Sequence, residues 1–223
     1  MGEWIQLQAS DGFRAKAWQV PAKGRARGGL VLVQEIFGVN GHIRDLARRL
    51  AEEGFDVVAP SLFDRAMPQV ELGYGREGIE RGVSLMQQAS LDAAMVDIAA
   101  AQDALDPGRP RAVMGFCWGG LVSWLAACRV PGLAAAVSYY PGGIGQFAHE
   151  APRCPVLLHL ARHDDHIPVA DGENARDAHP ARVTLHTYDA QHGFNCDQRA
   201  SFHAASATQA WERSLGFLRQ HLA

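Results

Sequence analysis

The chain has 223 residues and a formal net charge of −3, and it contains no apolar run long enough to cross a bilayer. Lysine and arginine are scattered among acidic residues, so we expect neither nucleic acid nor a membrane surface as a partner. The four cysteines lie far apart without a C-x-x-C pair, which favours reduced thiols over a disulfide framework or a zinc site. We therefore expect a cytoplasmic protein.

The predicted elements begin with an antiparallel pair of strands. Residues 3–7 and 13–20 are rich in strand-forming side chains and flank a Ser10-Asp11-Gly12 turn, which is typical of a β-hairpin. Residues 30–34 then form a short apolar run of the kind found in a strand that is buried on both faces. This run ends at Glu35, which places a carboxylate at the carboxyl end of a predicted strand.

Helices and strands alternate through the rest of the chain. Apolar residues at helical spacing predict the helices, and short continuous apolar runs predict buried strands. The predicted helices cover 43–52, 91–105, 169–178 and 200–221, and the predicted strands cover 55–60, 133–140, 155–160 and 182–188. This alternation predicts a mostly parallel central sheet with helices on both faces, in a single α/β domain over residues 1–223.

The segment 61–88 is less regular than the rest. Pro68 and several glycines interrupt its apolar pattern, so we expect a long loop that passes into a short helix. Long insertions beside a sheet that carries a site often form a pocket wall. The sequence therefore predicts that part of this segment covers the functional edge of the sheet.

A strand-like run meets a helix-like run between residues 111 and 125, at Gly115-Phe116-Cys117-Trp118-Gly119. The pattern Gly-x-nucleophile-x-Gly describes a sharp strand-to-helix turn whose small residues let the backbone crowd together and expose the middle side chain. Here the middle residue is a thiol. The alternative interpretation is a structural cysteine, because free cysteines are among the most buried residues.

Polar residues that complete such a site follow two later strands. Asp164 comes after the strand 155–160, and His192 comes after the strand 182–188. With Cys117, the chain presents a nucleophile, an acid and a base in the order of the α/β-hydrolase triad. In a parallel sheet the carboxyl ends of the strands share one edge, so we expect these side chains to meet there.

These motifs resemble those of the dienelactone hydrolases, or carboxymethylenebutenolidases, a family of the α/β-hydrolase superfamily. The resemblance covers nearly the whole chain. Its segments are Gln34 to Asn40, Gly54 to Pro60, Gly115 to Gly120, Tyr139-Tyr140, Asp164 four residues before Pro168, and His192-x-Phe194. It implies an α/β-hydrolase fold with a mostly parallel central sheet, helices on both faces and an antiparallel N-terminal hairpin.

The resemblance implies a catalytic triad of Cys117, Asp164 and His192. Asp165 is the adjacent rival for the acid, and the spacing to Pro168 favours Asp164. The resemblance also gives Glu35 a role, in which it holds the resting thiol protonated and accepts the thiol proton when substrate binds. A thiol kept neutral at rest is protected from oxidation, because the thiolate is the reactive form.

Two backbone N–H groups are expected to stabilise the oxyanion. The elbow offers that of Trp118, and the loop after the strand 30–34 offers that of Ile36. The aromatic residues predicted to line an apolar pocket beside them are Phe37, Trp118 and Tyr139.

The chain departs from its relatives at the substrate carboxylate. The best-known dienelactone hydrolases bind that group with two arginines, but Cys196 stands four residues after His192 and the nearest arginine is Arg199. The second arginine is therefore absent or displaced. For the first, Arg81 is the preferred candidate and Arg76 the alternative.

We expect a cofactor-independent hydrolase of carboxylic esters or lactones that forms a thioester acyl-enzyme. The expected substrate is small and can carry a carboxylate. The expected oligomeric state is a monomer or a small homo-oligomer. One alternative is an esterase or thioesterase for non-anionic substrates. Another is a non-catalytic protein with the α/β-hydrolase fold, in which Cys117 acts as a thiol sensor or belongs to a ligand-binding receptor. No metal is expected, because strand alternation scatters the only grouped histidines, His159, His163 and His166.

Overall fold

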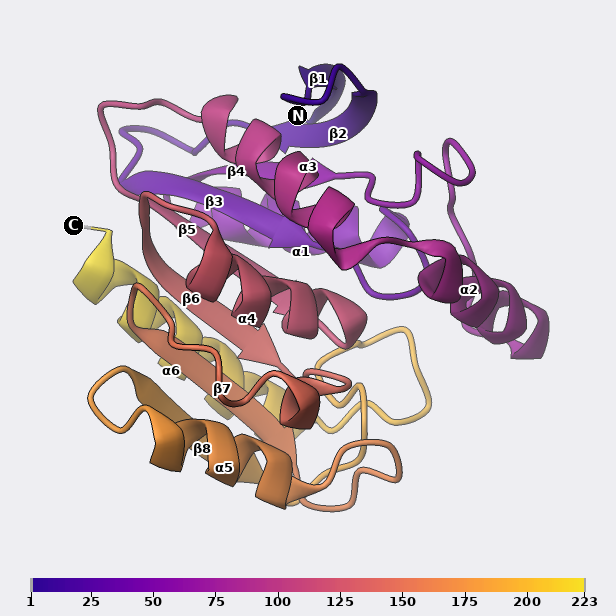
Figure 1. The fold of residues 1–223 in the computed structure, drawn as a ribbon, viewed down its shortest axis with the longest axis vertical. Helices are drawn as coiled ribbons and strands as arrows, with labels where there is room; N and C mark the ends of the chain where they lie inside the picture. The colour runs from indigo at the N-terminus through magenta and orange to yellow at the C-terminus, as the bar shows by residue number, and fades with distance from the viewer. Residues whose placement is uncertain (1, 223) are drawn as a thin grey trace.

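The computed structural model describes residues 2–222, and its strands form one eight-stranded sheet (Figure 1). The strands are β1 Glu3–Gln8, β2 Arg14–Val20, β3 Gly28–Val33, β4 Phe55–Pro60, β5 Arg111–Phe116, β6 Leu133–Tyr139, β7 Val156–Ala161 and β8 Val183–Tyr188. Their order across the sheet is β1-β2-β4-β3-β5-β6-β7-β8. The β1–β2 and β2–β4 pairs are antiparallel and the others are parallel, which confirms the predicted mixed sheet.

Helices cover both faces of this sheet. They are α1 Gly41–Glu52, α2 Arg76–Gln88, α3 Leu91–Asp103, α4 Trp118–Arg129, α5 Val169–Ala178 and α6 Ala204–His221, with a 3₁₀ turn at Ile144–Gln146. In Figure 1, α3, α4 and α5 lie in front of the sheet, and α1 and α6 lie behind it. No helix within residues 2–222 has the length and apolar character that crossing a membrane requires.

The central strand β3 shows why the sheet needs both layers. All six of its residues are buried. Leu30 and Leu32 pack in the apolar cluster that contains α1 and α6, whereas Val31 and Val33 pack in the cluster that contains α3 and α4. Successive side chains of a strand point to opposite faces, so a continuous apolar run demands cover on both.

The carboxyl ends of the parallel strands form the edge where the site residues gather. The α2 helix lies beyond this edge (Figure 1) and rests on the loop that follows β3. The contact is made at Gly82, where a Cβ atom would overlap the carbonyl oxygen of Ile36. The predicted pocket-wall helix is therefore a regular element of 13 residues.

The last helix starts later than its periodicity predicts, at Ala204 instead of residue 200. The preceding segment forms successive turns, because the backbone N–H of Arg199 bonds to Cys196 and that of Phe202 bonds to Arg199. These turns direct the side chains of Cys196 and Arg199 inward, where both become half-buried or buried.

Candidate active site

Cys117 occupies a strained elbow between β5 and α4. Its φ angle is +55°, a region that residues with a side chain rarely adopt and that costs roughly 1–3 kcal/mol. The turn is possible because its flanking residues have no side chain: a Cβ on Gly115 would overlap the carbonyl oxygen of Gly119. The backbone N–H of Cys117 bonds to the carbonyl of Tyr139, and the thiol stays partly exposed.

Asp164 and His192 meet at the same edge of the sheet. The carboxylate Oδ2 of Asp164 lies 2.8 Å from Nδ1 of His192. Its other oxygen accepts hydrogen bonds from the backbone N–H groups of His166 and Ile167, at 2.9 and 3.1 Å, so the carboxylate is held in place. The Asp164 side chain is fully buried, whereas the adjacent Asp165 is exposed.

The electrostatics of His192 favour its charged form. Burial alone would lower the pKa of the imidazole, but its hydrogen bonds to Asp164 and Cys117 outweigh burial and raise this pKa to about 10. For Asp164, burial alone would raise the pKa, but the bond to His192 lowers it below the usual value. At neutral pH the site therefore holds an imidazolium against an ionised carboxylate.

This pKa makes stability depend on pH. The folded protein binds the His192 proton more tightly than the unfolded chain, so the contribution is fully present below pH 6.5 and is lost as pH rises towards 10. We expect the free energy of unfolding of wild type to fall by about 2–5 kcal/mol more over this interval than that of His192→Gln. Urea unfolding at pH 6, 8 and 10 measures the difference, and parallel curves for the two proteins would contradict it.

Glu35 lies at the end of β3 with its side chain 1% exposed. Its Oε1 atom is 3.4 Å from the guanidinium of Arg199, whereas its Oε2 atom has no hydrogen-bond partner. Arg199 is stacked over Phe37, 5.6 Å from the ring centre, and it interacts electrostatically with both Glu35 and Cys117. Glu35 and the thiol thus share a cationic neighbour.

A cavity of about 470 Å³ opens above the elbow. Its lining includes His192 and four other residues that the sequence analysis placed in the site, namely Ile36, Phe37, Cys117 and Trp118. Arg199 and apolar side chains of α2 complete the lining. The lining residues are Ile36, Phe37, Ile79, Val83, Met86, Cys117, Trp118, Gly142, Gly143, His166, Ile167, His192 and Arg199. Glu35 and Asp164 lie behind this surface, each in contact with a lining residue.

Arg81, the preferred substrate arginine, lies outside this cavity. Its side chain is exposed and contacts Met67 at 3.0 Å. Helical geometry explains the difference, because Ile79, Val83 and Met86 share the inner face of α2 and a residue two positions from Ile79 points away from it. The alternative, Arg76, is 93% exposed at the side chain and pairs with Glu80.

Tyr139 also lies elsewhere than expected. It is fully buried in the layer beside α6, where its hydroxyl lies 2.8 Å from that of Ser214. The next residue, Tyr140, is the one that approaches the site, with its ring 5.0 Å from that of His192. Its φ angle of +34° marks a second strained position next to the elbow. The sequence prediction chose Tyr139 of the two adjacent tyrosines, whereas the structure brings Tyr140 to His192.

The grouped histidines make separate contacts. His159 is buried in the core, with its two ring nitrogens 2.8 Å from the Tyr188 hydroxyl and 2.9 Å from the Ser214 hydroxyl. His163 pairs with Asp189 at 2.6 Å. They do not converge as a ligand set.

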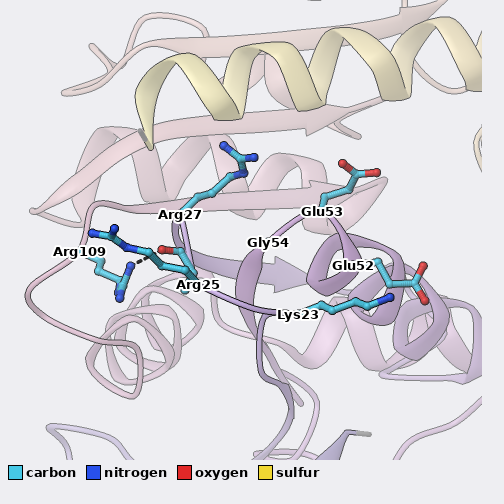
Figure 2. Close-up of a pocket in the computed structure, with 8 residues that line it drawn as sticks. Lys23, Arg25, Arg27, Glu52, Glu53, Gly54 and Arg109 are labelled. Carbon is cyan, nitrogen blue, oxygen red and sulfur yellow. Dashed lines mark hydrogen bonds between the residues drawn. The ribbon is translucent and has the colours of Figure 1, made fainter.

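A second pocket, of about 500 Å³, lies at the amino ends of β3, β4 and β5, on the opposite edge of the sheet (Figure 2). Charged side chains of both signs dominate its lining, and neither a thiol nor an imidazole is among them. The lining residues are Lys23, Arg25, Ala26, Arg27, Glu52, Glu53, Gly54 and Arg109. Of these two pockets, the cavity above Cys117 is the one whose lining includes a thiol and an imidazole.

Comparison with known proteins agrees with this geometry. The sequence model of the dienelactone hydrolase family matches residues 16–222. The chain belongs to the dienelactone hydrolase family. As a dienelactone hydrolase family member it is a carboxymethylenebutenolidase-like hydrolase, as the resemblance of its motifs implied.

Individual relatives of this dienelactone hydrolase family member extend over most of its length. A "Putative carboxymethylenebutenolidase" of Synechocystis sp. is 36% identical over 82% of each chain. The "Carboxymethylenebutenolidase" of Pseudomonas sp. (strain P51) is 32% identical and covers 98% of this chain and 95% of the relative. A crystal structure of a "Putative Dienelactone Hydrolase" from Klebsiella pneumoniae, 30% identical, covers 99% of both chains with a TM-score of 0.83. The predicted fold is thus confirmed.

Proposed function

We propose that the protein hydrolyses a small carboxylic ester or lactone through a thioester intermediate on Cys117. The observation that carries this proposal is the contact of Cys117 with His192 in the cavity, with Asp164 bonded behind His192. A nucleophile, a base and an orienting carboxylate are the groups that acyl transfer requires. Membership of the dienelactone hydrolase family supports the same chemistry.

In the first half-reaction the sulfur of Cys117 attacks the carbonyl carbon as a thiolate. The electron pair of the C=O bond moves to oxygen, and the backbone N–H groups of Ile36 and Trp118, which line the cavity beside Cys117, donate hydrogen bonds to it. The C–O bond of the ester then breaks, and His192 donates its proton to the departing oxygen. A thioester and an alcohol or enol result.

In the second half-reaction His192, now neutral, takes a proton from water as the water oxygen attacks the thioester carbon. The C–S bond breaks when the tetrahedral intermediate collapses, so the acid leaves and the sulfur remains as a thiolate beside the imidazolium. Asp164 keeps the ring orientation constant through both steps, because its bond to Nδ1 leaves Nε2 for the transfers.

Glu35 receives the proton of the resting thiol. In the free protein Arg199 contacts Glu35 at the long distance of 3.4 Å. A substrate carboxylate in the cavity competes for this guanidinium, and charge-assisted bonds of good geometry are stronger than the contact they replace. The released Glu35 carboxylate then accepts the thiol proton, so nucleophile formation is coupled to binding.

The cavity favours a compact acyl group with one negative charge. Its α2 wall is apolar, through Ile79, Val83 and Met86, and Arg199 is the arginine in its lining. The names of the relatives point to an enol-lactone with a carboxylate as the substrate.

Arg199→Gln should therefore lower kcat/KM for a carboxylate-bearing ester about 10- to 100-fold more than for the matched ester without the carboxylate, because one charged hydrogen bond is lost. If the substitution also disturbs Glu35, kcat/KM falls equally for the two esters, so the ratio between the two esters isolates the effect on the carboxylate. Arg81→Gln is the matched control, since Arg81 is exposed outside the cavity. An equal loss for both esters would exclude Arg199 as the carboxylate ligand.

The test of the function itself combines turnover with trapping. Wild type is assayed on an enol-lactone, an aryl ester and an aryl thioester, then quenched early and analysed by intact and peptide mass spectrometry. An acyl group on the peptide that contains Cys117 is expected. Hydrolysis of none of the three, or an adduct on Cys128 or Cys154 instead, would reject the proposal. Preference for the thioester would favour the non-anionic alternative.

A further inference from the structure

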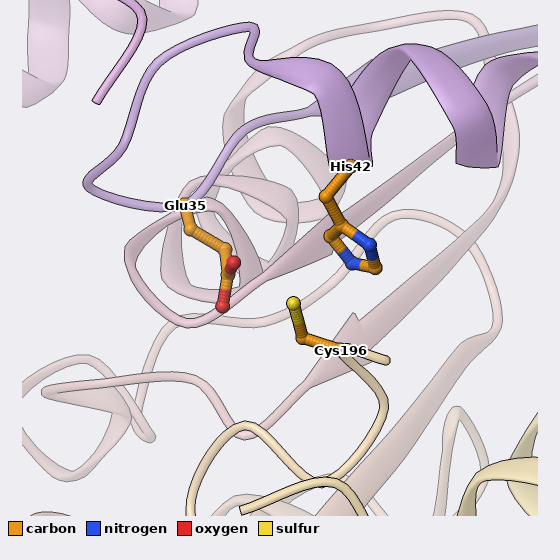
Figure 3. A group of neighbouring side chains, drawn as sticks. All are labelled: Glu35, His42 and Cys196. Atoms are coloured by element: carbon orange, nitrogen blue, oxygen red, sulfur yellow. The ribbon is translucent and has the colours of Figure 1, made fainter. Parts of the chain in front are cut away.

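Three buried side chains converge behind the cavity, from segments that are far apart in the sequence (Figure 3). Glu35 follows β3, His42 lies in the first turn of α1, and Cys196 lies in the turns between β8 and α6. One carboxylate oxygen, one ring nitrogen and the sulfur all lie within 4.8 Å of one another. None of the three side chains is more than 1% exposed.

Three polar atoms of this group lack a hydrogen-bond partner. Neither ring nitrogen of His42 makes a hydrogen bond, and Oε2 of Glu35 makes none. Leaving such atoms unpaired away from water costs free energy, so a buried imidazole without a partner needs an explanation. Arg199 approaches Glu35 through Oε1 only, which leaves Oε2 available to the group.

Asp197 lies beside the imidazole of His42, beyond hydrogen-bond contact. Its Oδ1 lies 3.5 Å from Nδ1 of His42, which favours the tautomer with the proton on Nδ1. The lone pair of Nε2 is then free to bind a cation. A carboxylate behind a ligating histidine is the recurrent outer arrangement of zinc sites.

We propose that Glu35, His42 and Cys196 bind a divalent transition-metal ion such as Zn²⁺, separately from the catalytic thiol. One thiolate, one imidazole and one carboxylate are a ligand set that suits zinc, whereas calcium and magnesium take oxygen ligands. The Cys196 thiol releases its proton to solvent as the Zn–S bond forms, so the charges of thiolate and carboxylate balance that of the ion. Water completes a tetrahedron.

The geometry requires only a small contraction. Zinc bonds of about 2.0–2.3 Å in a tetrahedron set the ligand atoms roughly 3.5 Å apart. The widest pair here, at most 4.8 Å, would close by at most about 1.3 Å. Oε2 of Glu35 has no hydrogen bond that a movement towards the ion would break.

The site predicts a form of regulation, and this consequence rests on the proposed function. A metal ion on Glu35 would compete with the thiol proton for the same carboxylate. Zn²⁺ should then inhibit hydrolysis reversibly, without contacting Cys117 or His192.

Metal binding is tested first, in a way that does not depend on activity. Co²⁺ is added to purified Cys117→Ala, which lacks the catalytic thiol, and the thiolate-to-cobalt absorption in the near ultraviolet is recorded. One Co²⁺ per chain, displaced by Zn²⁺, is expected. Cys196→Ser should abolish the absorption, whereas Cys154→Ser, the matched control at another buried cysteine, should keep it.

Two further variants keep the metal site testable if Cys196→Ser does not fold. His42→Gln removes the nitrogen ligand and should also abolish the absorption, and circular dichroism reports whether each variant is folded. Asp197→Asn should weaken Co²⁺ binding about 10- to 100-fold without abolishing it. The proposal is overturned if Cys117→Ala gives no absorption, or if the absorption survives in folded Cys196→Ser.

Inhibition is then measured as the fraction of each protein's own activity that Zn²⁺ removes and a chelator restores. Wild type should be inhibited, and Cys196→Ser should lose at least about tenfold in sensitivity to Zn²⁺ because one ligand is missing. Equal inhibition of both would place the inhibitory ion at Cys117 and overturn the regulatory consequence. A protein that binds Co²⁺ but hydrolyses nothing would reject the proposed function and leave the metal site standing.

Discussion

Cys117→Ala is expected to lower kcat for ester or lactone hydrolysis by about 10⁴-fold or more, because it removes the atom that carries the acyl group. Residual turnover would come from the oxyanion donors and from binding alone. The measurement is steady-state hydrolysis together with loss of the acyl adduct in the quenched protein. Cys154→Ala is the control, since that thiol is buried away from the cavity, and its kcat should stay within about threefold of wild type.

Cys117→Ser sharpens the same prediction. A serine hydroxyl is a much weaker acid than a thiol, so it does not supply the anionic nucleophile that the thiolate supplies. We therefore expect the serine variant to be nearly as inactive as the alanine variant at pH 7. Wild-type activity in Cys117→Ala would show that another group is the nucleophile.

Asp164→Asn is expected to lower kcat by about 10⁴-fold, the size of the effect when the orienting carboxylate of such a triad becomes an amide. The amide neither fixes the productive tautomer of His192 nor balances the charge on its ring. Folding should be less affected, since an amide oxygen can still accept the backbone N–H groups of His166 and Ile167.

Asp165→Asn is the matched control for this variant. The two aspartates are neighbours in the sequence, but Asp165 is exposed and Asp164 holds the His192 ring. We expect Asp165→Asn to stay within about threefold of wild-type kcat, as surface substitutions usually do. A large loss in Asp165→Asn with little change in Asp164→Asn would reverse the assignment of the acid.

The sequence was informative where a local pattern has one physical solution. The strand β4 and the helix α5 have the predicted bounds, because Gly54 and Pro60 mark the ends of β4 and Pro168 marks the start of α5. Gly115 and Gly119 identified the elbow in the same way, since only residues without a side chain fit there.

Other features depend on information that no local pattern carries. The rotation of α2 about its axis decides whether Arg81 or Ile79 faces the cavity. The glycines in the segment 61–88 interrupt the apolar pattern from which this rotation could be predicted. Strand alternation separates Tyr139 from Tyr140 but does not tell which layer each enters. His42 and Cys196 are 154 positions apart, and only the folded chain brings them together.

The contact of Gly82 with the carbonyl of Ile36 has a consequence for how such an enzyme can diversify. The helix α2 contacts the loop that follows β3 at a point that admits no side chain. From the same helix, Ile79, Val83 and Met86 line the cavity. Substitutions at these three positions can change the shape of the cavity for a new acyl group without moving the loop. Substrate specificity can thus change during evolution through substitutions in α2, while the residues at the carboxyl ends of the strands stay the same.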